Sequence, residues 1–327
     1  MLNELLELPI EINNYVFNKF LGSGAYSCVY EVMSQKYQKT FAAKVTPIDS
    51  SVMDDDGLLV DAELNALIAI DHPHVIRIYD FFEHEGYLVL ILEFCSGGTI
   101  QDFLSHKKSF SGEQIRIIGS EIVDALVFCH SQSIAHRDIK PSNIFIDAYG
   151  RSKVADFNLS AILSPKQLIN SPAGSYQFVA PEVLLNEAYD PYKADVWSLG
   201  ITFYHMHAGF LPWSEDCVKN NERSMLSFPK DFDYLLKSLI EHMVVEDPSK
   251  RYSMIDVFSD NFFKFTPRSS SSHRPFIKCT SNHGFTIQPL SPKGTQFSKS
   301  IRSNAVIPLR VKIQRHNSLV IKKTFYD

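Results

Sequence analysis

Residues 134–143 read IAHRDIKPSN, an apolar-flanked loop that carries three charges and an amide at fixed spacing. Thirteen residues beyond Asn143 comes Asp156, within the run VADFN. The triplet APE follows at 180–182, and the run DVWSLG at 195–200 is expected to open a further helix. These motifs are far more specific than any single turn or ion pair elsewhere in the chain.

Upstream of this loop the hydrophobic pattern predicts strands around one helix. Alternation and apolar runs bounded by turns predict strands at residues 15–21, 29–32, 40–45, 75–82 and 87–94. The helix is expected to begin near the acidic residues 54–56 and to end at His72-Pro73. Farther along, the pattern becomes helical, and Ser111 with Gln114 predicts a capping box. A β-rich small part before a helical large part is the α+β class.

Two features of the first third have both a bland and a functional interpretation. The turn at Gly22-Ser23-Gly24 would let backbone N–H groups approach phosphate oxygens, but an ordinary hairpin explains it equally well. A dinucleotide fingerprint is disfavoured because a strand, not a helix, follows the turn. Lys44 lies in a half-buried strand and needs a counter-ion, which Glu63 could supply 19 residues later. The alternative is a surface ion pair of little energy.

The order of these motifs resembles the signature set of the eukaryotic protein kinases: glycine loop, strand lysine, helix glutamate, HRD loop, DFG-type acid and APE. The resemblance covers about residues 15–264. It implies a bilobal protein kinase fold, with a β-rich N-lobe at about 15–94 and a mainly helical C-lobe at about 95–264. It also implies transfer of the γ-phosphoryl group of ATP to serine or threonine hydroxyls of protein substrates.

The resemblance assigns roles to four residues of the middle region. Asp138 would accept or orient the proton of the substrate hydroxyl, and Lys140 would steady the transferred phosphoryl group. Asn143 and Asp156 would hold Mg²⁺, with Mn²⁺ as an alternative, because such hard cations prefer oxygen ligands.

The resemblance also assigns an ATP site. Lys44 would hold the α- and β-phosphates and pair with Glu63, so both belong to the catalytic set. The expected ATP-binding residues are Leu21, Gly22, Ser23, Gly24, Ala25, Tyr26, Ser27, Cys28, Val29, Ala42, Lys44, Glu93, Cys95 and Phe145. Residues 93–95 would form the hinge, with Leu92 as the gatekeeper. The two cysteines are expected to be inert small residues, because the sequence offers them no basic partner.

Serine/threonine specificity and control follow from the same resemblance. Residues 138–141, DIKP, are similar to the serine/threonine kinase loop, and Ser175 sits where those kinases place a hydroxyl that contacts it. By its spacing from the APE triplet, Ser171 matches the usual activation-segment phosphosite, whose phosphate would pair with Arg137. A constitutively ordered segment is the alternative. Glu182 is expected to pair with Arg251. Two further stretches, 210–213 and 243–248, look most like the calcium/calmodulin-dependent and AMP-activated kinase branch.

Three departures from the family pattern leave a second class open. Ser27 replaces the third loop glycine, Asn158 replaces the DFG glycine, and Phe145 is bulkier than the usual leucine. Asparagine tolerates left-handed backbone better than most residues, so the turn at Asn158 is expected to survive. None of the three removes a catalytic group. The alternative is a pseudokinase or scaffold with the same fold, and a small-molecule kinase is a weaker third option.

Charge divides the chain in two. Residues 265–327 hold eleven Lys/Arg against the single acid Asp327, a net +10, whereas residues 1–264 carry −15. With ten serines and five prolines, this tail is expected to be flexible and solvated, and to dock intramolecularly or merely to aid solubility. Residues 1–14 are taken as an N-terminal extension. No nucleic-acid partner and no transmembrane segment are expected, and five scattered cysteines fit a cytoplasmic location, with nuclear entry left open.

Overall fold

The computed structural model describes residues 8–24, 27–48, 61–107, 109–164, 167–185, 187–220, 222–264, 275–280 and 284–289. These residues fall into two compact units. The strand unit holds the described residues up to Asp71 together with Ile76–Phe94, and the helical unit holds His72–Val75 and the described residues from Cys95 onward. Within the described part of the chain, no helix combines the length and apolar character needed to cross a membrane.

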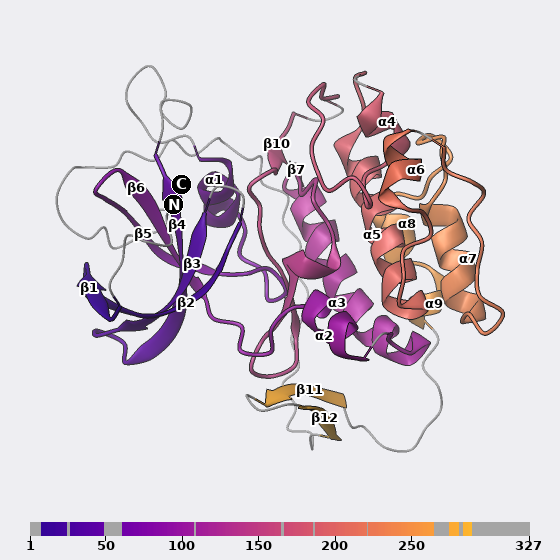
Figure 1. The fold of residues 1–327 in the computed structure, drawn as a ribbon. Helices are drawn as coiled ribbons and strands as arrows, with labels where there is room; N and C mark the ends of the chain where they lie inside the picture. Colours follow the sequence, from indigo (N-terminus) through magenta and orange to yellow (C-terminus); the bar gives the residue numbers. More distant parts are fainter. Residues whose placement is uncertain are drawn as a thin grey trace, which may run out of the picture. The chain divides into compact units, whose positions relative to one another are not determined.

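The strand unit is built on one antiparallel sheet of six strands in the order β1-β2-β3-β4-β6-β5 (Figure 1). Its strands are β1 (Ile10–Ile12), β2 (Tyr15–Ser23), β3 (Cys28–Ser34), β4 (Lys39–Pro47), β5 (Ile78–His84) and β6 (Tyr87–Glu93). All five predicted strands are present, but β5 starts at Ile78 rather than at residue 75. Val75 belongs to the helical unit, where it forms a single bridge with Val154. Strand β1 was not predicted and lies within the segment taken as an N-terminal extension.

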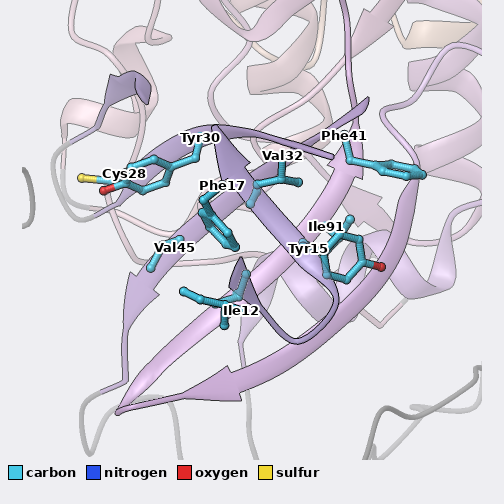
Figure 2. Packing of buried hydrophobic residues seen from close by; sticks show 11 residues of the cluster. Ile12, Tyr15, Phe17, Cys28, Tyr30, Val32, Phe41, Val45 and Ile91 are labelled. Carbon is cyan, nitrogen blue, oxygen red and sulfur yellow. The ribbon is translucent and has the colours of Figure 1, made fainter. Parts of the chain in front are cut away.

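The two faces of this sheet have different compositions because side chains alternate along each strand. One face carries an apolar core that includes Phe17, Tyr30 and Val32 (Figure 2). In β3 and β4 the residues between the core positions point to the opposite face. Val29 pairs directly with Lys44 in the register of these two strands, so both side chains lie on that second face.

The helix of the strand unit is α1 (Ala62–Ala69), and it carries Glu63 in its first turn. Its N-cap is Asp61, whose carboxylate accepts a hydrogen bond from the Leu64 amide at 2.8 Å. The sequence had suggested a start near residues 54–56, which lie outside the described residues. The capping carboxylate of Asp61 defines the start of the described helix.

The helical unit contains most of the helices. They are α2 (Ile100–Lys107), α3 (Gly112–Ser131), α4 (Pro181–Leu184), α5 (Pro191–Ala208), α6 (Glu215–Lys219), α7 (Tyr234–Met243), α8 (Met254–Phe258) and α9 (Asn261–Lys264). The capping box predicted at the start of α3 is confirmed, with Ser111 and Gln114 exchanging hydrogen bonds of 2.9 and 3.3 Å. A chain that holds one unit of strands and one unit of helices confirms the α+β class.

Helix α5 begins earlier than predicted. The sequence suggested Asp195 as its opening, but the helix starts at Pro191, and Asp190 caps it. Proline is favoured at the first helical position because its missing N–H would have no partner there. Asp195 consequently lies inside a helix that is buried on nearly all sides. An acid at such a position needs polar partners.

Short strands frame the loop at 136–143. They are β7 (Ile134–Ala135) paired with β10 (Ala161–Ile162), and β8 (Ile144–Ile146) paired with β9 (Ser152–Val154). In the basic tail, the structure describes an antiparallel pair, β11 (Pro275–Thr280) and β12 (Gly284–Pro289). The tail stretch at 309–318 lies outside the described residues.

Candidate active site

The loop at 136–143 is held in shape by a buried carboxylate. Asp195 accepts hydrogen bonds from the backbone amides of His136 at 2.9 Å and Arg137 at 2.7 Å, and its side chain is fully buried. His130 approaches the same carboxylate with Nε2 at 2.9 Å. Arg137 has a φ of 68°, a left-handed conformation that is unfavourable for a long side chain. The bonds to Asp195 stabilise this strained backbone, and with it the position of the next residue, Asp138.

Asp138 lies at the centre of a network of predicted site residues. Its Oδ2 accepts from Lys140 Nζ at 2.6 Å and from Asn143 Nδ2 at 3.1 Å. Its Oδ1 accepts from the Ser175 amide at 3.0 Å and from the Ser175 hydroxyl at 2.9 Å. Lys140 Nζ also donates to the Ser175 hydroxyl at 2.8 Å. The loop at 136–143 and the segment at 156–182, called the activation segment below, thus bring a carboxylate, a cation, an amide and a hydroxyl together. This arrangement can position a hydroxyl nucleophile and a transferring phosphoryl group.

The second predicted acid, Asp156, is anchored through its neighbours. The Ala155 amide donates to the Asn143 carbonyl at 2.9 Å, and the Ala155 carbonyl lies 3.0 Å from His136 Nε2. Phe157 is fully buried, and its ring centroid lies 4.6 Å from that of His136. These contacts join the segment at 155–157 to the catalytic loop.

The backbone of this segment explains why Asn158 is tolerated. The residue with left-handed backbone is Asp156, with a φ of 65°, and Asn158 is not among the described residues with positive φ. The family pattern predicts a left-handed conformation at Asn158, which asparagine accepts better than most residues. That requirement does not arise, because the turn places its unusual φ two residues earlier. The missing glycine therefore costs no backbone strain here.

Asn143 and Asp156 offer a donor set that fits Mg²⁺ shared with a nucleotide. Both supply oxygen, and Asn143 directs its amide nitrogen to Asp138, at 2.8 Å from the carbonyl and 3.1 Å from Oδ2. The described residues contain no cluster of three or more His, Cys, Asp or Glu that could hold a metal by itself. Magnesium in phosphoryl-transfer sites typically takes one or two protein carboxylates and completes its shell with phosphate oxygens and water. Asn143 and Asp156 fit this arrangement, in which the protein supplies only part of the ligand shell.

Lys44 and Glu63 form a buried ion pair in the strand unit. Lys44 Nζ lies 2.7 Å from Glu63 Oε2, and their side chains are only 8% and 3% exposed. The alternative of a weak surface pair is therefore wrong. Ala42 lies two residues before Lys44 on the same strand face and pairs with Leu92 of β6. This face presents small and apolar side chains next to a fixed cation, which suits a base and its phosphates.

The glycine-rich turn is partly described. Gly22 and Ser23 end β2, and the Gly24 amide donates to the Ser27 carbonyl at 2.8 Å; Ala25 and Tyr26 lie outside the described residues. A Cβ added at Gly22 would meet no described atom within 4 Å, and its φ is not positive. Neither packing nor backbone conformation therefore requires glycine at this position.

One predicted ATP-binding side chain lies elsewhere. Cys28 is 2% exposed and belongs to the core cluster with Phe17 and Tyr30 (Figure 2), on the face opposite Val29. Strand alternation is the reason: adjacent residues of β3 cannot both face the same side. Cys28 is a core residue.

The remaining predicted ATP-binding residues are divided between the two units. Leu21 lies on β2 and is 41% exposed, and Glu93 ends β6. In the helical unit, Cys95 follows directly, and Phe145 lies on β8, where it bridges to Thr99. Both Cys95 and Phe145 are half-buried.

The activation segment contacts the catalytic loop through two serines. Besides Ser175, Ser171 receives hydrogen bonds from the Arg137 guanidinium on its hydroxyl, at 2.8 Å, and on its carbonyl. Tyr189 donates to the same carbonyl at 3.1 Å. Gly174 has a φ of 107°, and a Cβ there would lie 2.7 Å from the Arg137 carbonyl, so this position requires glycine.

Glu182 and Arg251 form the predicted ion pair. Two guanidinium nitrogens of Arg251 reach the two carboxylate oxygens of Glu182 at 2.6 and 2.9 Å. The Arg251 side chain is fully buried and lies over the ring of Trp197, with its Cζ 5.1 Å from the ring centroid.

Sequence reasoning missed the two residues that support the loop. Asp195 falls in a run that predicts a helix, and the sequence assigns it no role, although an acid at the start of an apolar helical run can indicate a buried hydrogen-bonded carboxylate. His130 carried no such signal, because histidine near a helix C-terminus is common for reasons of the helix dipole alone.

Comparison with known proteins agrees with this geometry. A family profile described as "Protein kinase domain" matches residues 15–263. The chain is 33% identical over 252 residues to the serine/threonine-protein kinase kin-29 of Caenorhabditis elegans, which covers 76% of this chain and 30% of that protein. It is 29% identical over 296 residues to the CBL-interacting serine/threonine-protein kinase 20 of Arabidopsis thaliana, covering 86% and 67%. It is 30% identical over 273 residues to the serine/threonine-protein kinase SIK3 homolog of Danio rerio, covering 82% and 23%.

The chain spans less than a third of the length of two of these relatives, so the shared part is the catalytic domain and not the whole of either protein. The profile, by contrast, accounts for most of this chain. The matched residues include Asp138 and the Lys44–Glu63 pair. The chain belongs to the protein kinase family.

Proposed function

We propose that this chain is an ATP-dependent protein kinase that transfers the γ-phosphoryl group of ATP to serine or threonine hydroxyls of protein substrates. The observation that carries the proposal is the Asp138 carboxylate, which is bonded at once to Lys140, Asn143 and Ser175. Its support comes from relatives that are named serine/threonine-protein kinases.

The chemistry divides among the residues by charge. Asp138 orients the substrate hydroxyl and accepts its proton, while the Lys140 ammonium stabilises negative charge on the phosphoryl oxygens. Asn143 and Asp156 would hold Mg²⁺, which neutralises phosphate charge when bound. In the strand unit, Lys44 holds phosphate oxygens, and Glu63 fixes the direction of its side chain. A Cβ at Gly22 would have no described atom within 4 Å, which suits a close approach of the backbone to phosphate.

A pseudokinase with the same fold is the competing class. A decayed site would be expected to have lost its cation, its acids or their contacts. Here Lys44 retains its buried partner, Asp138 retains its network, and Asn158 replaces glycine without positive φ. These observations favour an active enzyme.

The test is phosphoryl transfer by the purified full chain with ATP and Mg²⁺, and then with Mn²⁺, on a serine/threonine peptide library. Asp138→Asn and Lys44→Met should each lower the rate about a thousandfold or more, equivalent to roughly 4 kcal/mol of transition-state stabilisation. Glu241→Gln is a matched control, because its carboxylate is half exposed in a surface pair with Lys237. Near-normal activity of Asp138→Asn would overturn the mechanism, and a wild-type chain that binds ATP without transfer would favour the pseudokinase.

The proposal includes control through Ser171. A phosphate there would lie beside Arg137, which already donates to the Ser171 hydroxyl. A charge-assisted bond is roughly twice as strong as a neutral one, so phosphorylation would tighten the contact between segment and loop. Mass spectrometry of active enzyme should find phosphate on Ser171, and Ser171→Ala should lower activity. Full activity of that variant would place the switch elsewhere or show that the segment needs none.

We propose that this kinase has only a weak or a different preference for basic residues near the target hydroxyl of its substrates. Cyclic-AMP-dependent kinase reads arginines with glutamates around its peptide groove, and the matching positions here are Thr99, Ser142 and His205. Asp102 is a nearby acid that could partly substitute for those glutamates. Its Oδ2 already accepts from the Thr99 amide and hydroxyl, both at 2.8 Å, which diverts part of its charge to local structure.

A further inference from the structure

The guanidinium of Arg137 is a cation whose described partners are all neutral. It donates to the Leu159 carbonyl at 3.1 Å, to the carbonyl and hydroxyl of Ser171, and to the Tyr189 hydroxyl at 3.3 Å. Its Nε is buried and has no hydrogen-bond partner within the described part of the chain. A partly buried cation without a counter-ion is unfavourable, so an anion at this point would be stabilised.

The residue that could carry such an anion is accessible. Ser171 and the next residue, Pro172, are both exposed. The segment is tied down close by, because Ile169 and Tyr189 exchange backbone hydrogen bonds of 3.1 and 2.9 Å. The Ser171 hydroxyl is therefore presented on a short exposed stretch next to a fixed anchor, which another enzyme can reach.

The sequence around Ser171 restricts which enzyme can modify it. Proline follows directly, and it has no N–H to donate and a fixed φ. Some kinases hold a peptide by accepting a hydrogen bond from the backbone N–H of the residue after the target. On this substrate such a kinase would leave its own acceptor unpaired, because that residue is Pro172. The four residues before Ser171 read QLIN and contain no basic side chain. A kinase that recognises upstream arginine or lysine has nothing to bind there.

The same dipeptide occurs a second time in the activation segment. Ser164 precedes Pro165, and Ser164 is exposed. Its amide donates to the Gln167 side chain at 2.8 Å. The sequence thus holds two Ser-Pro dipeptides seven residues apart, and both are suited to one class of modifying enzyme.

We propose that Ser171 is phosphorylated in trans by a proline-directed serine/threonine kinase, and not by this chain itself or by a kinase that requires basic residues. The inference rests on the proposed control through Ser171. In the step, the Ser171 hydroxyl oxygen forms a bond to the γ-phosphorus of ATP, the bond from that phosphorus to the β–γ bridging oxygen breaks, ADP leaves, and the modifying kinase takes the hydroxyl proton. The new phosphate supplies the counter-ion that Arg137 lacks among the described residues.

The test uses the full-length Asp138→Asn chain as a substrate, so that its own activity is irrelevant to the result. A cyclin-dependent kinase with its cyclin serves as the proline-directed probe, and cyclic-AMP-dependent kinase serves as the basic-directed one. Phosphate on Ser171 is quantified by mass spectrometry. The proline-directed probe should modify Ser171, and Pro172→Ala should lower the rate at that residue about tenfold or more, the scale expected for a lost recognition contact. Pro165→Ala, which alters the other dipeptide, should leave it unchanged.

The outcomes separate this inference from the proposed function. If the wild-type chain incubated alone with ATP and Mg²⁺ phosphorylates its own Ser171 as fast as the proline-directed probe does, the chain is a kinase and the inference is wrong. It is equally wrong if Pro172→Ala leaves the probe's rate unchanged, or if the basic-directed probe is the faster one. If the probe modifies Ser171 in a chain that proves inactive on every substrate, the inference stands and the proposed function fails.

Discussion

Replacing Glu182 by glutamine should destabilise the helical unit strongly. The substitution keeps the size of the side chain and removes the charge that faces two nitrogens of Arg251, at 2.6 and 2.9 Å. Because the Arg251 side chain is 0% exposed, water cannot take the place of the lost partner. Leaving a buried charge unpaired typically costs about 3–5 kcal/mol.

This energy converts into a measurable change of melting temperature. For a domain of about 250 residues, 1 kcal/mol corresponds to roughly 2–4 °C, so Glu182→Gln should lower the melting temperature by about 6–20 °C. The control is Glu241→Gln, because Glu241 lies 3.8 Å from Lys237 and both side chains are about half exposed, at 52% and 43%. A surface pair of this kind contributes about 0–1 kcal/mol. Thermal unfolding followed by circular dichroism compares the two variants.

If Glu182→Gln melts within the range of the surface control, then Arg251 does not depend on the carboxylate. Its further bonds, to the carbonyls of Val245 at 2.9 Å and Lys193 at 2.8 Å, would then be sufficient for the guanidinium. The buried pair would in that case contribute little to the stability of the unit.

Four further outcomes are expected. Burial raises the pKa of Asp80, whose carboxylate accepts a hydrogen bond from the Tyr15 hydroxyl at 3.0 Å, so the stability contributed by this group falls as pH rises above 3.8. At pH 7, Asp80→Asn should therefore melt no lower than wild type, whereas Asp80→Ala, which removes the acceptor, should lower the free energy of unfolding by about 1–3 kcal/mol. Burial lowers the pKa of His205 below 6.5, so the unfolded chain takes up the proton first and stability is lost as pH falls through that value. Between pH 7.5 and pH 5.5, the melting temperature of His205→Gln should therefore fall less than that of the wild type. A peptide-library screen should lack a dominant arginine three residues before the target, and its presence would contradict the proposed substrate preference. If the basic tail (residues 265–327) docks on the acidic domain and inhibits it, residues 1–264 alone should be more active than the full chain at low salt, and the difference should shrink at high salt. Equal activity and an equal response to salt in the two proteins would exclude such docking.

Much of the fold and site could be predicted because the signals are local. The apolar pattern located the five predicted strands of the sheet, and a capping box located the start of α3. The resemblance to the protein kinases named Asp138, Lys140 and Asn143, which lie close together in one loop, and it also named Ser175.

The parts that could not be predicted depend on contacts distant in sequence. Asp195 is 57 residues from Asp138, and its role exists only because α5 packs under the loop. The assignment of Cys28 to the ATP site overlooked the alternation that places it in the core. The concern over Asn158 came from a family pattern, whereas the structure places the left-handed residue at Asp156.

The position of Asp195 links catalysis to the interior of the protein. The carboxylate that shapes the loop belongs to a helix whose other buried residues are mostly apolar, so its coordinates are set by side-chain packing. Substitutions along α5 that change volume by a single methyl group would move the loop together with the helix. Such variants would lose turnover before they lose the fold, and mutational screens for activity would mark as functional many residues that never approach a substrate. For this chain, a map of activity against sequence would trace the core of the helical unit as much as the active site.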